Sequence, residues 1–158
     1  MKKIYLALFA LQLVLSTYSQ GINSQYFPKD NIIDTQYLCD MQKWITNSEW
    51  QEIIVKYRRI WKSQMYLEMD RLINLIPDQV EDIKLYQKDW EKNLYNTEEL
   101  VQINVDQNKV GRQPYFDWLS SITELYRQRS IYYFCLYYTI KEQSDDSFQY
   151  HDNLELAR

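Results

Sequence analysis

The residues able to do chemistry in this 158-residue chain are mostly carboxylates. The one histidine, His151, lies close to the C-terminus, so a His-based catalytic triad or metal cage cannot be assembled in the core. The chain has no glycine-rich phosphate loop, no H-E-x-x-H motif and no C-x-x-C motif. Classical hydrolase and redox mechanisms are therefore disfavoured, and neither a metal nor a cofactor is expected.

Three groups of acidic residues could in principle serve acid–base catalysis or bind calcium. They are Glu98 with Glu99, Asp78 with Glu81 and Asp82, and Asp145 with Asp146. Adjacent residues on a helix do not face one another, which argues against Glu98 and Glu99 as a working pair. Carboxylates at a helix start are also favoured by the helix dipole. We therefore assign no catalytic residue, although an uncharacterised enzyme with a carboxylate site remains an alternative.

The N-terminus has the pattern of a secretory signal peptide. Lys2 and Lys3 precede an apolar run over residues 4–15, and small or polar residues follow over 16–20. The run is shorter than the roughly 20 apolar residues that a membrane-crossing helix needs. We expect residues 1–20 to be cleaved, which predicts a periplasmic or secreted protein of the bacterial envelope with no stable membrane span. Retention as an anchor is the alternative.

The net charge narrows the class of partner, and the small number of turn-forming residues narrows the class of fold. Removal of residues 1–20 takes two of the 18 basic residues and none of the 22 acidic ones, which leaves a formal net charge of −6. Nucleic acid is therefore disfavoured as a partner, and a basic protein is favoured. The 2 glycines and 3 prolines are too few for a many-stranded sandwich and are typical of long helices.

Apolar periodicity predicts an all-α domain over residues 34–142, built as a small antiparallel bundle of three to five helices. An extended lead-in over residues 21–33 precedes it, and a polar, acidic tail over residues 143–158 follows it. We expect helices over residues 34–45, 48–76, from 78 to about 104, and 115–140, with a loop over residues 104–114.

Local signals set the expected helix ends. Ser48 and Gln51 form the S-x-x-Q pattern of a capping box, and Pro77 should end the long helix that begins there. A break at Asn96 in the next helix stays open, because Asn prefers caps to helix interiors. Residues 131–138 are apolar or aromatic on all sides, which predicts the centre of the bundle. A β-strand is the alternative for this octet.

The two cysteines, Cys39 and Cys135, could form a disulfide in an oxidising compartment. Such a bridge would join the first predicted helix to the last. In the chain-entropy model it would stabilise the fold by about 4 to 5 kcal/mol. The alternative is two separate, small, buried residues.

Two stretches resemble the LprI-type lysozyme inhibitors, a family of small, secreted, helical bacterial domains. Gln87 and Trp90 are similar to the Q-x-x-W of a family helix. Gly111 and the segment ending in Arg129 are similar to a loop glycine followed by the last helix of the family. The family usually carries cysteines where this chain has Glu98 and Ser121, so this chain departs from it there.

The resemblance implies a non-enzymatic domain that binds and blocks a lysozyme at the cell envelope. The acidic charge would suit a strongly basic lysozyme. A periplasmic immunity protein that neutralises one wall- or membrane-attacking toxin would share the same size, acidity and helicity, and is a second possible function.

Overall fold

The computed structural model describes residues 26–43, 45–104 and 113–144, with side chains in α4 described as far as residue 96. Within these ranges the chain is helical and contains no strand, which confirms the all-α prediction. The elements are α2 (Ile32–Met41), α3 (Asn47–Leu75), the 3-10 helix η2 (Pro77–Gln79), α4 (Val80–Asn104) and α6 (Gln113–Ser144). The predicted signal peptide, Gly111 and most of the predicted tail lie outside the described residues.

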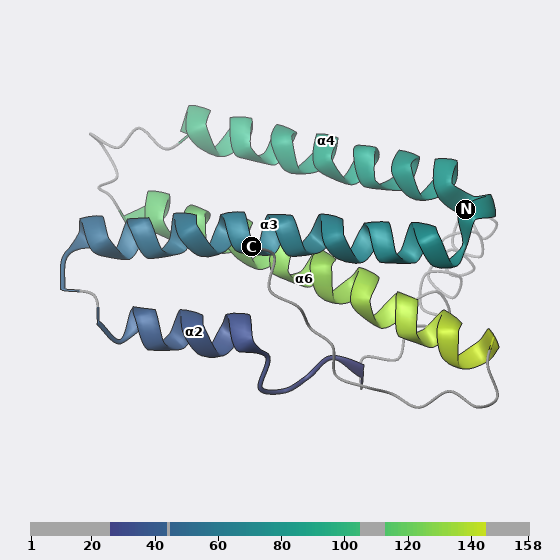
Figure 1. Ribbon diagram of the computed structural model, residues 1–158. Coiled ribbons are helices and arrows are strands. Elements are labelled where there is room, and N and C mark those ends of the chain that lie inside the picture. The colour runs from purple at the N-terminus through teal and green to yellow at the C-terminus, as the bar shows by residue number, and fades with distance from the viewer. Residues whose placement is uncertain (1–25, 44, 105–112, 145–158) are drawn as a thin grey trace, which may run out of the picture.

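The long helix α3 lies in the middle of the domain (Figure 1). α2 and α4 flank it on opposite sides, and both run antiparallel to it. α6 crosses α3 obliquely in the same general direction, and these two helices form the closest packing in the domain. The bundle is therefore antiparallel between successive helices, whereas its main contact joins two helices that run the same way.

The capping box at the start of α3 begins two residues earlier than predicted. Thr46, in an extended conformation, accepts a hydrogen bond from the Glu49 backbone N–H at 3.2 Å. The Glu49 carboxylate accepts in return from the Thr46 backbone N–H at 2.8 Å. The predicted box of Ser48 and Gln51 is wrong, because a carboxylate satisfies the positive end of the helix dipole better than an amide does.

The remaining boundaries shift by a few residues. α2 begins at Ile32, because the Asn31 side chain caps it by accepting from the Asp34 backbone N–H at 2.8 Å. α3 ends just before Pro77, as predicted, and α4 continues through Asn96 without a break. α6 begins at Gln113 and includes Pro114, since a proline in the first turn of a helix removes no helical hydrogen bond.

The core joins the apolar side of α3 to α6. The apolar side of α3 is buried at its centre, where Tyr57, Trp61, Met65 and Leu72 are at most 2% exposed. They pack with residues of α6, and Leu94 of α4 completes the same cluster. The octet 131–138 is helical and supplies core residues, as expected.

A second, smaller cluster attaches the lead-in to α6. Tyr26 and Phe27 pack against Phe134 and Tyr138, with the Phe27 and Phe134 ring centroids 5.7 Å apart. The Tyr26 hydroxyl also donates a hydrogen bond to Glu142. The described end of the lead-in is therefore part of the packed domain.

The predicted disulfide is wrong for this structure, because Cys39 and Cys135 are both free thiols. Cys39 is exposed on α2, whereas Cys135 is 1% exposed within the second cluster. The backbone of Phe27 hydrogen-bonds the Cys135 thiol, and burial raises the pKa of that thiol to about 11. The lead-in, rather than a second sulfur, therefore covers Cys135.

None of the helices in the described ranges is both long enough and apolar enough to cross a membrane.

Candidate functional site

A groove of about 380 Å³ lies between α2, α3 and α6, and we call it the α2 groove. Its floor is apolar and aromatic, since Ile54, Tyr57 and Trp61 are at most 2% exposed. Polar and charged residues of the lead-in, α2 and α6 form its rim. The full lining is Lys29, Asp34, Tyr37, Leu38, Ile54, Tyr57, Trp61, Ser120, Thr123, Glu124 and Arg127.

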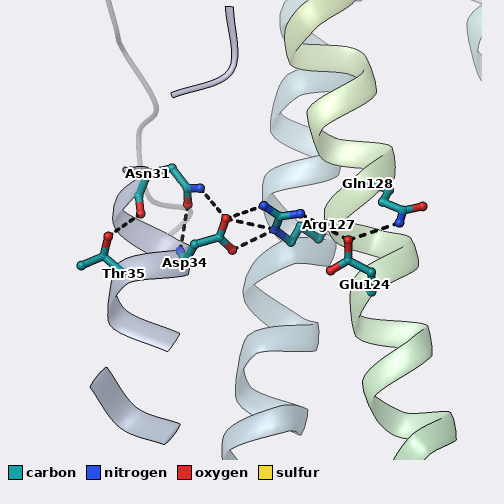
Figure 2. A network of polar contacts seen from close by, with 6 residues as sticks. All are labelled: Asn31, Asp34, Thr35, Glu124, Arg127 and Gln128. Atoms are coloured by element: carbon teal, nitrogen blue, oxygen red, sulfur yellow. Dashed lines mark hydrogen bonds and ion pairs between the residues drawn. The ribbon is translucent and has the colours of Figure 1, made fainter. Parts of the chain in front are cut away.

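An ion pair between α2 and α6 closes one side of this groove. Arg127 donates from Nη2 to Asp34 Oδ2 at 2.6 Å and from Nε to Oδ1 at 2.9 Å. Figure 2 shows the two side chains meeting across the space between their helices. The hydrogen bonds to Asp34 raise the pKa of Arg127, so the guanidinium stays charged.

Neighbouring side chains hold this ion pair in position (Figure 2). On α2, the Asn31 side chain caps the turn that carries Asp34. On α6, Glu124 accepts from Arg127 Nη1 at 3.2 Å and also from Gln128 at 3.2 Å. The Arg127 guanidinium carbon lies 5.7 Å from the centroid of the Trp61 ring, within the range of a cation–π contact. These contacts connect the rim residues of α2 and α6 to one another and to the aromatic floor.

A second polar contact fixes the other end of α2. Tyr57 donates from its hydroxyl to Asp40 Oδ2 at 2.9 Å, and Lys56 donates to the same oxygen at 2.7 Å. These two hydrogen bonds, the one from Lys56 foremost, hold the pKa of Asp40 below its ordinary value. Tyr37 stacks edge-on against Tyr57, with ring centroids 5.1 Å apart. α2 is therefore attached to α3 and α6 by polar contacts at both of its ends.

The carboxylates on the rim of the α2 groove are held in ion pairs. Asp34 pairs with Arg127 at 2.6 Å, and Glu124 pairs with the same arginine at 3.2 Å. No three His, Cys, Asp or Glu side chains gather into a metal-binding group in the described ranges. An apolar floor with a polar, hydrogen-bonded rim is the usual composition of a site that receives part of another molecule.

The residues singled out from the sequence lie elsewhere. Gln87, Trp90 and Arg129 meet between α4 and α6, where Arg129 Nε donates to Gln87 Oε1 at 3.2 Å. The Arg129 guanidinium carbon lies 5.4 Å from the Trp90 ring centroid. Of the four residues that carry the family resemblance, the structure thus brings together three, and they lie between α4 and α6 rather than at the α2 groove.

The acidic groups of the sequence do not form a site in the described structure. Asp78 in η2 and Glu81 and Asp82 in the first turn of α4 are exposed, as expected for helix-start charges. The side chains of Glu98 and Glu99, and the pair Asp145 with Asp146, lie outside what the structure describes. The groups that do converge, Asp34 and Arg127, are 93 residues apart. No local spacing could have indicated that pair.

No protein-family model matches this chain, and neither a curated protein nor a solved structure matches it.

Proposed function

We propose that this chain is an exported, non-enzymatic domain that binds another protein through the α2 groove. The observation that supports the proposal best is the buried aromatic floor beneath a rim already held by the Asp34–Arg127 ion pair. A rim ordered before binding loses little conformational entropy when a partner arrives. A groove of this size accommodates one or two side chains of a partner loop as anchors.

The proposed partner is basic. Residues 21–158 carry a formal net charge of −6, and α2, which forms one wall of the groove, has two acidic residues and no basic one. This excess attracts a basic protein and raises its association rate at low salt. A lysozyme is the first candidate, because of the resemblance carried by Gln87, Trp90, Gly111 and Arg129.

The test is a binding titration and an inhibition assay with hen-type and goose-type lysozymes, run at two salt concentrations. A Leu38→Lys variant places a charged side chain on the groove wall, where Leu38 is 60% exposed. Leu85→Lys is the matched control, because Leu85 is 58% exposed on α4 and outside the groove. Both variants change the net charge equally, so only the position of the new charge differs.

We expect saturable binding that weakens at high salt, with Leu38→Lys at least about tenfold weaker than Leu85→Lys, as for loss of an interface anchor. Equal affinities for the two variants would rule out the α2 groove as the contact surface. Absence of binding at low salt would rule out these lysozymes. The immunity function would then be tested with a dedicated toxin as the partner.

A further inference from the structure

A cavity of about 320 Å³ lies between α3, α4 and α6, and we call it the α4 cavity. It has no lining residue in common with the α2 groove. Its walls are formed by Leu72 from α3, by Asp82, Ile83 and Tyr86 from α4, and by Tyr132, Tyr133 and Leu136 from α6. All of these residues except Asp82 are aliphatic or aromatic. The cavity is therefore a mainly apolar space, with a volume at the lower end of ligand sites in proteins.

The wall of the α4 cavity changes from apolar to charged between its floor and its mouth. Leu72 and Tyr133 are at most 2% exposed, so they form the deep part of the wall. Asp82 and Tyr86 are exposed on α4, so they form the part of the wall that meets the solvent. A ligand that fits this change in polarity has an apolar body directed inward and a charged group at the mouth.

Asp82 determines the sign of that charged group. It is the only charged residue among the described residues that line the cavity. Its carboxylate has no hydrogen-bond or ion-pair partner among the described residues, whereas the neighbouring Glu81 pairs with Lys84 at 4.0 Å. A carboxylate at the mouth of an apolar space attracts an ammonium group and repels a second carboxylate. The charged group of a matching ligand is therefore a cation.

The nearby cation Arg129 contacts the tyrosine rings but does not line the cavity. Its guanidinium carbon lies 4.7 Å from the centroid of the Tyr86 ring and 5.4 Å from that of the Trp90 ring. Trp90 follows Tyr86 by about one helical turn on α4, whereas Asp82 precedes Tyr86 by about one turn. Arg129 is therefore near the end of this α4 segment opposite to Asp82. The turn that carries Tyr86 separates it from an ammonium group bound at Asp82.

We propose that the α4 cavity binds a small primary amine with an apolar or aromatic body. The ammonium group pairs with the Asp82 carboxylate at the mouth, and the body lies against Leu72, Leu136 and the tyrosine rings. Burial of the body contributes most of the affinity, because an exposed ion pair contributes little. The carboxylate gives the preference for an amine over a neutral or an acidic analogue. This site is separate from the α2 groove and does not depend on the proposed partner.

The probe is phenethylamine, titrated at low salt into the full chain and followed by heteronuclear NMR. Phenethyl alcohol has nearly the same shape without the charge, phenylacetate has the opposite charge, and ethylamine keeps the ammonium group without the ring. We expect saturable shifts with phenethylamine at about millimolar concentration, centred on residues 82–86 and 132–136. Phenethyl alcohol should bind about threefold more weakly, and phenylacetate and ethylamine at least about tenfold more weakly. Equal binding of phenethylamine and phenethyl alcohol, or no saturation by phenethylamine, would overturn the proposal.

Two variants test the role of the carboxylate. Asp82→Asn should weaken phenethylamine binding about threefold and leave the binding of phenethyl alcohol unchanged. Asp78→Asn is the matched control, because Asp78 is an exposed helix-start carboxylate that does not line the cavity. It changes the net charge equally and should bind phenethylamine as the wild type does, and circular dichroism checks that both variants fold. If the two variants bind phenethylamine equally, Asp82 is not the counter-ion of the ligand and the site as proposed is wrong.

Discussion

The Asp34–Arg127 ion pair should be energetically coupled, because it joins α2 to α6 and is shielded from water on most sides. Its side chains are 23% and 29% exposed, and two guanidinium nitrogens contact the carboxylate. Fully exposed pairs contribute about 0.2 to 1 kcal/mol. Hydrogen bonds to charged groups contribute about 1.5 to 3 kcal/mol. A partly buried bidentate pair lies between these ranges, so we expect a coupling energy of about 1.5 kcal/mol.

A double-mutant cycle measures this coupling directly. The free energy of unfolding is obtained by urea denaturation for the wild type, Asp34→Ala, Arg127→Ala and the double variant, followed by circular dichroism. The double variant should lose less stability than the sum of the two single variants, by the coupling energy. Because the pair is partly shielded, added salt should reduce the coupling only in part.

An exposed pair on α4 provides the matched control. Lys84 and Glu81 are 4.0 Å apart, with side chains 58% and 88% exposed. Their coupling energy should be near zero and should vanish with added salt. A coupling for Asp34 and Arg127 below about 0.3 kcal/mol, indistinguishable from this control, would show that the pair does not hold α2 against α6.

Two further predictions concern the start of α3 and the thiols. Thr46→Ala should lower the free energy of unfolding by about 1 kcal/mol through loss of the cap. Ser48→Ala should change it by less than about 0.5 kcal/mol. If urea denaturation shows the larger loss for Ser48→Ala, the capping box is the one predicted from the sequence. A thiol reagent should modify Cys39 rapidly in the native protein and Cys135 only on unfolding, because burial raises the pKa of Cys135 to about 11; equal labelling rates, measured by mass spectrometry, would contradict this burial.

The helices could be predicted from sequence because their signals are local. The spacing of apolar residues along α3 depends only on the helical repeat, and Pro77 ends a helix through its own geometry. The capping box was predicted in the wrong register because Thr46 and Glu49 fit the same pattern two residues earlier. Competition between two overlapping local patterns is decided by the electrostatics of the helix end.

The α2 groove could not be predicted because Asp34 and Arg127, which pair across it, are 93 residues apart. The buried polar residues of α3 were missed for a different reason, although their contacts are local. Gln64 and Glu68 are 0% exposed on α3, although polar residues are expected at the surface. They are tolerated because they hydrogen-bond each other at 2.8 Å and because Arg71 pairs with Glu68. A polar residue among apolar positions of a helix does not show from the sequence whether it is exposed or buried in such a network.

The pairing of α3 with α6 bears on the order in which the chain acquires its structure during synthesis. α3 ends at residue 75, whereas its main partner begins at residue 113 and ends at residue 144. The ribosome therefore releases α2, α3 and α4 before most of α6 exists, and the aromatic side of α3 stays uncovered in the meantime. Folding cannot finish until α6 has been synthesised, so a nascent chain that stalls before α6 is open to proteases and aggregation.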